Sequence, residues 1–460
     1  MKDLIKAPII LAGYLLFAPM LGMWIKNSRR TQGWIFGLMV FMTSWHINKF
    51  TLMLGSIETY RGHSKGFEFS FIEILAVALI YASVLKRKAS DRSWKWLPPG
   101  ALLYLLYCAV SLCSIYAAPN RLYVLMAAER FAKAILVYIG AFHFIREEKD
   151  VRLMLKAAAM TLMVQAVVVL KMKYVDHFYQ VRGWFEHQNP LAMWAYMLGL
   201  PLLAAAMSNA PKQESRWYVA GFIAAGIIVQ SSLSRAALLA FGAGIALVVA
   251  LAMFDKVTRK RVVFVLGMGA VGFLAVMLAA NTIIARFHDE GNEASGETRT
   301  VMNLASKAML QSSSVGIGWN NFALTINHPF PFGDVIDDRE RERGCTVDED
   351  YAKGVVESHY WLMLAETGYG GLLTYLLFIS AGLWWCLRGI FRWRRQFLAA
   401  YCAGLFIALV LIYLHSNLER VLTQTKNMST WLLLLGVSAR VETWRRAGTG
   451  TDFPGSPRKQ

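Results

Sequence analysis

Apolar runs long enough to cross a bilayer recur along the whole chain. About 20 apolar residues in one α-helix span the hydrocarbon core, and a helix satisfies its own backbone hydrogen bonds there. Charged residues make up 17% of the 460 residues, and the mean hydropathy is +0.40. Ordinary soluble domains carry about 25% charged residues. The sequence therefore predicts an all-α polytopic membrane protein and excludes an ordinary soluble domain.

Thirteen apolar runs are candidate spans, and leaving out the first or the last gives an alternative count of twelve. Ten runs precede one long polar stretch and three follow it. In order, they cover residues 4–25, 33–54, 69–86, 97–117, 124–145, 152–172, 190–208, 217–233, 236–254, 262–285, 358–387, 397–415 and 428–440.

The charge of the loops predicts the orientation of the chain. Clusters of Lys and Arg follow odd-numbered spans, at 26–30, 86–95, 256–261, 388–395 and 440–446. Basic loops mark the cytoplasmic side of an inner-membrane protein. The net charge of +18 has this origin, so it does not indicate nucleic-acid binding. The long polar stretch then falls on the exoplasmic side.

Three parts are expected along the chain. Residues 1–180 hold the N-terminal transmembrane helices, 181–440 hold the functional region, and 441–460 form a basic cytoplasmic tail. The functional region contains the large exoplasmic loop, 286–357. This loop has a formal charge of −6, from thirteen carboxylates against seven basic groups, opposite in sign to the cytoplasmic loops.

Short surface helices are expected within the exoplasmic loop. Apolar residues recur at helical spacing after Arg299, which predicts an amphipathic helix that starts near this residue and lies along the membrane. These residues are Val301, Leu304, Ala305 and Ala308. The charged run Asp337–Gly344 is expected to be a solvated loop. Gly316–Gly318 lacks the third glycine and the strand of a nucleotide loop, so a tight turn is the better explanation.

Three arginines and a histidine are expected at the exoplasmic ends of the spans: Arg182, Arg235, Arg299 and His359. A guanidinium matches two phosphate oxygens and stays charged at every relevant pH. Together the arginines indicate a site for a phosphate or pyrophosphate at the membrane surface. Taken singly, each arginine has a plainer explanation, because interfacial arginines commonly reach toward lipid headgroups.

His359 is the candidate proton acceptor. It follows Ser358, a plausible N-cap, and a helix N-terminus keeps an imidazole neutral. The alternative is an interfacial histidine bonded to backbone. Glu366, two turns further on the same face, would either orient His359 or form a polar contact between helices. Lys133 would either add charge to the anion site or form a salt bridge within its own helix.

No metal site and no cofactor are expected. The remaining histidines show no HxxxH-like pairing, and the five cysteines show no metal-type spacing.

Four segments in the second half resemble the bacterial O-antigen ligase and O-antigen polymerase superfamily. They are Arg182–Ala192 (RGWFEHQNPLA), Leu233–Ala240 (LSRAALLA), Arg299 through Gly316–Phe322 (GIGWNNF), and Ser358–Leu373 (SHYWLMLAETGYGGLL). Each motif alone is weak, and their order on a many-span scaffold carries the resemblance, which covers roughly 180–375. The chain departs from the family pattern at Tyr360, where the family often has Asn.

The resemblance implies a membrane glycosyltransferase of the GT-C-like type in the bacterial inner membrane, with its active face periplasmic. The donor would be a glycan on undecaprenyl pyrophosphate, and the acceptor a second glycan or a lipid A core. The family's functional histidine would correspond to His359, and its arginines to Arg182, Arg235 and Arg299. The candidate catalytic residues are then His359, Arg235 and Arg299. The candidate substrate-binding residues are Arg182, Arg235, Arg299, Glu366 and Lys133, the last two from their positions in the sequence. The family is understood to need neither metal nor nucleotide.

Two other classes of function remain open. A transporter or flippase of lipid-linked saccharide would also show many spans and interfacial arginines, but it predicts charges near the bilayer midplane. A non-catalytic subunit of an envelope-glycan assembly predicts that a His359 substitution is tolerated. The sequence does not separate ligase from polymerase.

Overall fold

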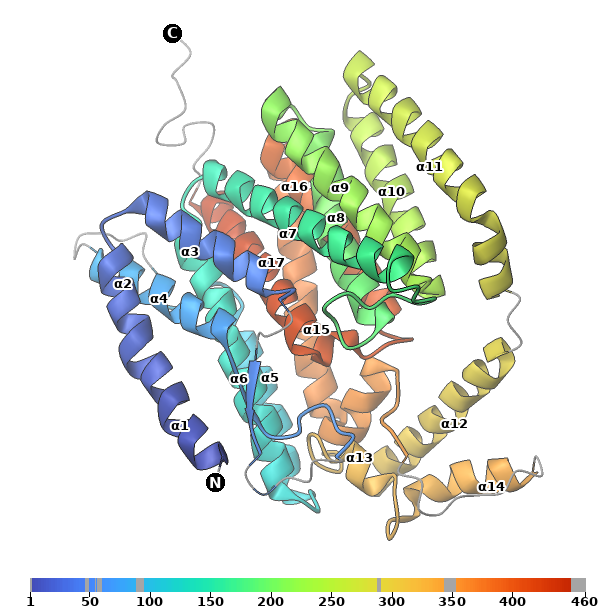
Figure 1. Ribbon diagram of the computed structural model, residues 1–460. Coiled ribbons are helices and arrows are strands. Elements are labelled where there is room, and N and C mark those ends of the chain that lie inside the picture. Colours follow the sequence, from blue (N-terminus) through green and yellow to red (C-terminus); the bar gives the residue numbers. More distant parts are fainter. Residues whose placement is uncertain are drawn as a thin grey trace.

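The computed structural model describes residues 2–45, 49–53, 55, 60–87, 95–287, 291–342 and 353–447, and these are mostly helical (Figure 1). The elements are α1 (Lys2–Ala12), α2 (Ala18–Ile25), α3 (Arg29–Met42), β1 (Lys49–Leu52), β2 (Phe67–Ser70), α4 (Phe71–Leu85), α5 (Ala101–Leu112), α6 (Arg121–Phe144), α7 (Glu148–Tyr174), α8 (Gln188–Ala206), α9 (Lys212–Ser232), α10 (Arg235–Asp255), α11 (Arg259–Phe287), α12 (Gly291–Ser312), α13 (Phe322–Thr325), α14 (Asp334–Glu342), α15 (His359–Arg392), α16 (Phe397–His415) and α17 (Thr425–Arg446).

Six helices of the described chain are long and apolar enough to cross a membrane. They cover residues 6–25, 148–174, 188–206, 235–255, 359–392 and 397–415. Two shorter apolar helices, 71–85 and 101–116, accompany them. The expectation of an all-α membrane architecture is confirmed at this level. The count of twelve or thirteen spans and the sidedness of the loops stay predictions.

The candidate span 33–54 is wrong in its second half. Helix α3 ends at Met42, where the Thr43 hydroxyl donates back to the Val40 carbonyl at 2.7 Å. Residues 49–52 then form β1, which pairs antiparallel with β2 and sets Leu52 opposite Phe67. The run looked helical because it is apolar, but aromatic and β-branched residues also suit a short strand. The resulting hairpin is the only sheet among the described residues.

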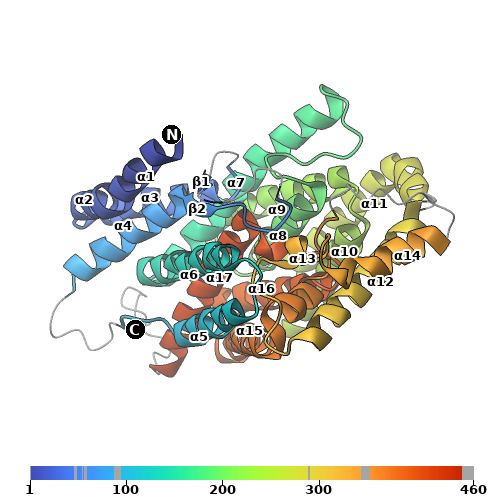
Figure 2. The ribbon, with the colours of Figure 1, turned by 90° about the horizontal axis from the view of Figure 1, so that it is seen from below.

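Helix α8 forms the centre of the bundle. All of its residues from Pro190 to Ala206 are buried, and it packs against α9, α10 and α16. A helix that is apolar all round needs such a position. Helices α1 and α11 lie at opposite outer edges of the bundle (Figures 1 and 2).

The two ends of the bundle differ in chemistry. At one end, where α8 finishes, the Arg261 guanidinium donates to the Met207 carbonyl at 2.9 Å, and the Lys260 ammonium donates to the Ser208 carbonyl at 3.1 Å. At the other end α8 and α15 begin, and α12 and α14 lie below the bundle (Figure 1). The candidate residues Arg182 and His359 belong to this second end.

Two expectations for the polar stretch need correction. Helix α12 starts at Gly291, so Arg299 lies inside it rather than at its start. The prediction that one face of this helix is buried is confirmed for Val301 and Ala305 but is wrong for Leu304, which is 49% exposed. Residues 334–342 form α14, so the part of Asp337–Gly344 that the structure describes is helical rather than a loop. Exposed pairs three residues apart, Arg339 with Glu342 among them, suit that helix.

Candidate functional site

A cavity of about 420 Å³ opens at the end of the bundle where α8 begins. Its wall combines α6, the chain between β1 and β2, the turn before α8, the segment between α16 and α17, and the start of α17. Four basic groups and one carboxylate give the wall a formal charge of +3 with its imidazole neutral. The charged and titratable lining residues are His63, Arg130, Arg182, Glu186, Arg420 and Lys426.

The turn before α8 brings Arg182 to the cavity. The Phe185 amide donates to the Arg182 carbonyl at 2.9 Å, and Gly183 has φ +52°. A Cβ at Gly183 would meet the Gln165 amide nitrogen at 2.1 Å, so a side chain there would push this turn away from α7. Arg182 is exposed and has no ion pair among the described residues. Arg182 therefore lines the cavity, and its role at an anion site stays a prediction.

The segment between α16 and α17 supplies Arg420, and the first turn of α17 supplies Lys426. The Lys426 ammonium donates to the Trp184 carbonyl and lies 4.9 Å from the centre of the Phe185 ring. This contact joins the start of α17 to the turn that carries Arg182. Burial lowers the pKa of Arg420, and nearby carboxylates oppose that shift, Glu366 most strongly. An arginine stays charged under such a shift, so Arg420 is a fixed cation on the wall.

Helix α6 places Arg130 deep in the cavity and Lys133 outside it. Arg130 is 3% exposed, and its Nε lies 3.7 Å from Glu68, which also accepts a hydrogen bond from Thr425 at 2.9 Å. The Lys133 ammonium instead pairs with Glu129 at 2.6 Å, one turn away on the same helix. Of the two roles considered for Lys133, the structure supports the intrahelical salt bridge.

The chain between β1 and β2 carries His63 into the wall. The Asn320 side chain binds the backbone of Ser64, the residue after His63, through two hydrogen bonds. Its Nδ2 donates to the Ser64 carbonyl at 2.8 Å, and its Oδ1 accepts from the Ser64 amide at 3.1 Å. We call this pair of bonds the Asn320 clamp. The Tyr60 hydroxyl donates to the Asn320 carbonyl. Residues more than 250 positions apart are therefore held together beside the cavity.

Residues 313–322 form the tight turn expected for this segment. Gly316 and Gly318 have φ values of +85° and +106°, and the Gly318 amide donates to the Glu366 carbonyl at 3.1 Å. A Cβ at Gly316 would lie 2.4 Å from the Glu366 backbone. Helix α15 bends at this point, where Gly368 has φ +65°. The close approach of the two backbones explains Gly316 and Gly368, whereas a Cβ at Gly318 would meet Ala118 at 2.4 Å.

Glu366 faces His63 rather than His359. One carboxylate oxygen accepts from the Phe322 amide at 3.1 Å, and the other lies 3.6 Å from Nδ1 of His63. The side chain is 2% exposed. Of the two roles considered for Glu366, the described contacts fit a polar packing contact, here with a histidine from the first half of the chain, and the orientation of His359 stays a prediction.

His359 begins α15 but does not line the cavity. Its backbone amide donates to the Ser416 carbonyl at 2.9 Å, and its ring packs edge-on against Tyr375 with the centroids 5.2 Å apart. The ring is buried, and neither nitrogen has a hydrogen-bond partner among the described residues. His359 is close enough to His63 for its charge to lower the pKa of that residue.

Arg299 is held by carboxylates beside the cavity. It lies 2.5 Å from Glu357 and 3.4 Å from Glu419, and Asn189 donates to Glu419 at 2.6 Å. Burial raises the pKa of Glu419 to about 7, and Glu357 adds to the shift. Arg299 therefore ties α12 to the residue that precedes Arg420, and its guanidinium is already paired.

Arg235 begins α10, directly after the end of α9. It is half-buried, and it is not among the described residues that line the cavity. The structure thus brings Arg182 to the cavity, sets Arg299 and His359 next to it, and leaves Arg235 at the start of its own helix.

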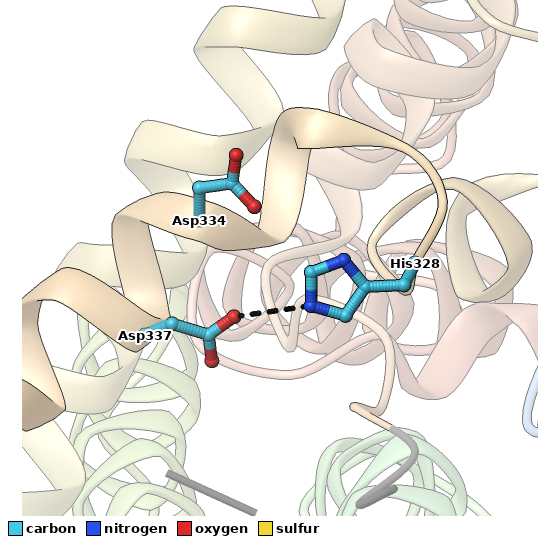
Figure 3. Close-up of side chains that lie close together, drawn as sticks. All are labelled: His328, Asp334 and Asp337. Atoms are coloured by element: carbon cyan, nitrogen blue, oxygen red, sulfur yellow. Dashed lines mark ion pairs between the residues drawn. The ribbon is translucent and has the colours of Figure 1, made fainter. Parts of the chain in front are cut away.

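One cluster in the long polar stretch has the residue types of a metal site. His328, Asp334 and Asp337 hold their ligand atoms within 4.8 Å of one another, and the His328 ring faces Asp337 at 3.8 Å (Figure 3). However, the Lys353 ammonium lies 2.8 Å from Asp337. Both groups are buried, so the ammonium already neutralises the central carboxylate. The contacts fit an ion pair that fastens α14 better than a cation site.

Sequence reasoning missed four wall residues: His63, Arg130, Arg420 and Lys426. A signal was present for three of them. His63 lies in a short polar stretch of the mainly apolar first half, and Arg420 and Lys426 lie between the last two apolar runs, on the same expected face as Arg182. Arg130 looked like one member of a charged helix turn, and only packing shows which of its side chains faces inward.

Comparison with models of known protein families finds no match, and comparison with curated proteins finds none either.

Proposed function

We propose that the protein is an integral membrane glycosyltransferase of the GT-C-like type. It would transfer a glycan from an undecaprenyl-pyrophosphate carrier to an acceptor hydroxyl at the periplasmic face of a bacterial inner membrane. The O-antigen ligase type and the O-antigen or exopolysaccharide polymerase type both fit this description. The observation that carries the proposal is the cavity with four basic side chains at one end of an apolar helix bundle.

The charge of the wall suits a diphosphate. Arg130, Arg182 and Arg420 reach the cavity from three different elements, so their guanidinium groups approach a ligand from several sides. Arg182 and Arg420 can each donate two parallel hydrogen bonds to phosphate oxygens, and Arg130, whose Nε lies 3.7 Å from Glu68, adds positive charge. The formal charge of +3 offsets the charge of a pyrophosphate in a partly desolvated site, where electrostatic interactions are stronger than in water. A neutral sugar alone would not need this arrangement.

The same side chains supply the chemistry of the proposed transfer. As the bond between the anomeric carbon and the pyrophosphate oxygen breaks, negative charge grows on the leaving group, and fixed cations stabilise it. A histidine takes the proton of the attacking hydroxyl, a role that the sequence assigns to His359. Direct displacement inverts the anomeric centre. The residues of 320–357 that the structure describes lie at this end and would shape the acceptor site.

A transfer assay in detergent tests the proposal. Purified protein is incubated with a lipid-pyrophosphate-linked glycan and a glycan acceptor, and products are analysed for a new glycosidic bond. An enzyme forms this bond without a membrane, whereas a flippase or transporter has no compartments to connect and forms none. The acceptor that is consumed also distinguishes ligase from polymerase. A protein that binds the donor but leaves it intact under all acceptor conditions would refute the proposal.

The third class, a non-catalytic assembly subunit, is tested in cells. His359→Ala should abolish the glycan product while the protein stays in the membrane, as the family resemblance predicts for this histidine. Normal glycan levels in a strain with only this variant would support the assembly role. His177→Asn serves as the control, because His177 is exposed and has a positive φ that Asn also adopts.

A further inference from the structure

His63 is the histidine on the cavity wall. Its side chain is 3% exposed, and neither ring nitrogen has a hydrogen-bond partner among the described residues. A buried polar group without a partner is costly, so most are paired in native proteins. An imidazole that borders a cavity in this state is suited to a ligand that supplies the missing hydrogen bond.

Glu366 lies beside His63 without a hydrogen bond to it in this structure. The Phe322 amide fixes one carboxylate oxygen at 3.1 Å, and the second lies 3.6 Å from Nδ1 of the imidazole. A small approach of the two side chains would place the Nδ1 proton on this oxygen and leave Nε2 as the acceptor nitrogen. A base oriented by a third group recurs in enzymes that activate a hydroxyl. Contacts of this kind often tighten only when substrate is bound.

The surroundings keep the imidazole neutral. Burial is the main cause that lowers the pKa of His63 well below its ordinary value, and the charges of Arg130, Arg420 and His359 lower it further. These groups belong to α6, to the segment between α16 and α17, and to α15, and Glu366 faces the ring from α15. A neutral imidazole can accept a proton, so His63 is ready for this role at neutral pH.

We propose that His63, oriented by Glu366, accepts the proton of the acceptor hydroxyl in the cavity. The inference rests on the proposed function and specifies its proton step. The hydroxyl oxygen forms a bond to the anomeric carbon, its proton passes to Nε2 of His63, and the bond to the carrier breaks with its electron pair on the pyrophosphate oxygen. His359 does not line the cavity, so this assignment replaces the role that the sequence gives to His359.

Kinetics of matched variants test the proton step. His63→Gln keeps a polar side chain but loses the titrating ring, so transfer should fall about 100-fold or more, the lower range of general-base contributions. Donor binding should stay within about 3-fold, because the guanidinium groups remain. The decline of the rate at low pH should disappear. Glu366→Gln keeps an acceptor for the Phe322 amide and should lower the rate less, with a changed pH profile.

Two results would overturn the proton step while transfer itself is established. The first is a His63→Gln variant with a rate near that of the wild type. The second is a His359→Gln variant that loses the pH dependence while His63→Gln keeps it. Melting temperatures show whether each variant folds. His63→Ala provides a second measure, since added imidazole should restore part of its rate if the ring acts as a base. A folded variant without any rescue argues against the role.

Chemical labelling gives a readout that does not depend on transfer. Diethyl pyrocarbonate should modify His63 faster than His359, and excess inorganic pyrophosphate should slow the modification of His63 by filling the cavity. Mass spectrometry of the labelled peptides measures both rates. Faster labelling of His359, or no protection of His63, contradicts the placement. A wild type with the expected labelling that forms no glycosidic bond refutes the proposed function instead.

Discussion

Replacing Asn320 with alanine should loosen the chain that carries His63. Asn320 and Ser64 are both fully buried. The Asn320 side chain pairs the amide and the carbonyl of Ser64, and without it neither backbone group can reach solvent for a replacement hydrogen bond. An unpaired buried backbone group costs about 1–3 kcal/mol, so the loss of both bonds should cost about 2–6 kcal/mol. The positive φ of +61° at this position adds about 1 kcal/mol for alanine.

The backbone contribution can be measured separately. Asn320→Gly also lacks the side-chain bonds, but glycine adopts a positive φ without strain. It should therefore be more stable than Asn320→Ala by about 1 kcal/mol. Thermal unfolding in detergent, followed by the fluorescence of the 15 tryptophans, compares the two variants with the wild type. An alanine variant that melts with the wild type, or a glycine variant less stable than alanine, would refute this reasoning.

Asn327 offers a matched control away from the cavity. Its Oδ1 accepts from the Lys353 amide at 2.7 Å, and its Nδ2 donates to the Lys353 carbonyl at 3.2 Å. Asn327→Ala should lower stability without changing how inorganic pyrophosphate protects His63 from labelling. Asn320→Ala should change both properties. Equal effects of the two variants on protection would show that the Asn320 clamp does not position His63.

Three further predictions concern other charges. Arg420→Gln should weaken binding of inorganic pyrophosphate about 10- to 100-fold in calorimetry, from the loss of charge-assisted hydrogen bonds, whereas Arg394→Gln at the opposite end should have no effect; equal losses would indicate non-specific attraction. Lys353→Met should destabilise the protein by about 3–5 kcal/mol in thermal unfolding, since Asp337 keeps a buried charge, and Asp337→Asn should recover part of this loss; an unchanged melting temperature contradicts the ion pair. The pKa of Glu419 is raised to about 7 from 4.5, so the folded state binds this proton more tightly than the unfolded state does. The free energy of unfolding should therefore increase by about 3 kcal/mol from this group as pH falls from 7 to 4.5. A Glu419→Gln variant whose stability depends on pH as the wild type's does would exclude Glu419 as the cause.

The helices were predictable because each apolar run is itself the signal. The error at 33–54 shows the limit, since hydropathy does not say where backbone hydrogen bonding changes from helix to strand. Asp337–Gly344 shows a second limit, because a charged run can be a solvated loop or a solvated helix. In both cases the local pattern allowed two structures, and contacts with distant segments decided between them.

The candidate site was predictable only in part. Arg182 and the turn at Gly316–Gly318 could be located from residue types and neighbouring spans. The pairing of Glu366 with His63 joins positions about 300 residues apart, and no local pattern encodes it. For the same reason Arg299 looked like an open phosphate ligand, whereas Glu357 and Glu419 already occupy its guanidinium. The charge of the side chains and their expected depth in the membrane suggested a site, but tertiary packing determines which of these residues line the cavity.

The wall of the cavity joins residues from position 62 to position 426, almost the whole length of the chain. A ribosome must therefore deliver nearly every helix to the membrane before the pocket exists. Until the start of α17 is made, Arg420 and Lys426 cannot meet Arg182, so a nascent or truncated protein lacks part of the basic wall. If the cavity binds the proposed diphosphate, the order of synthesis would keep an unfinished copy from capturing it.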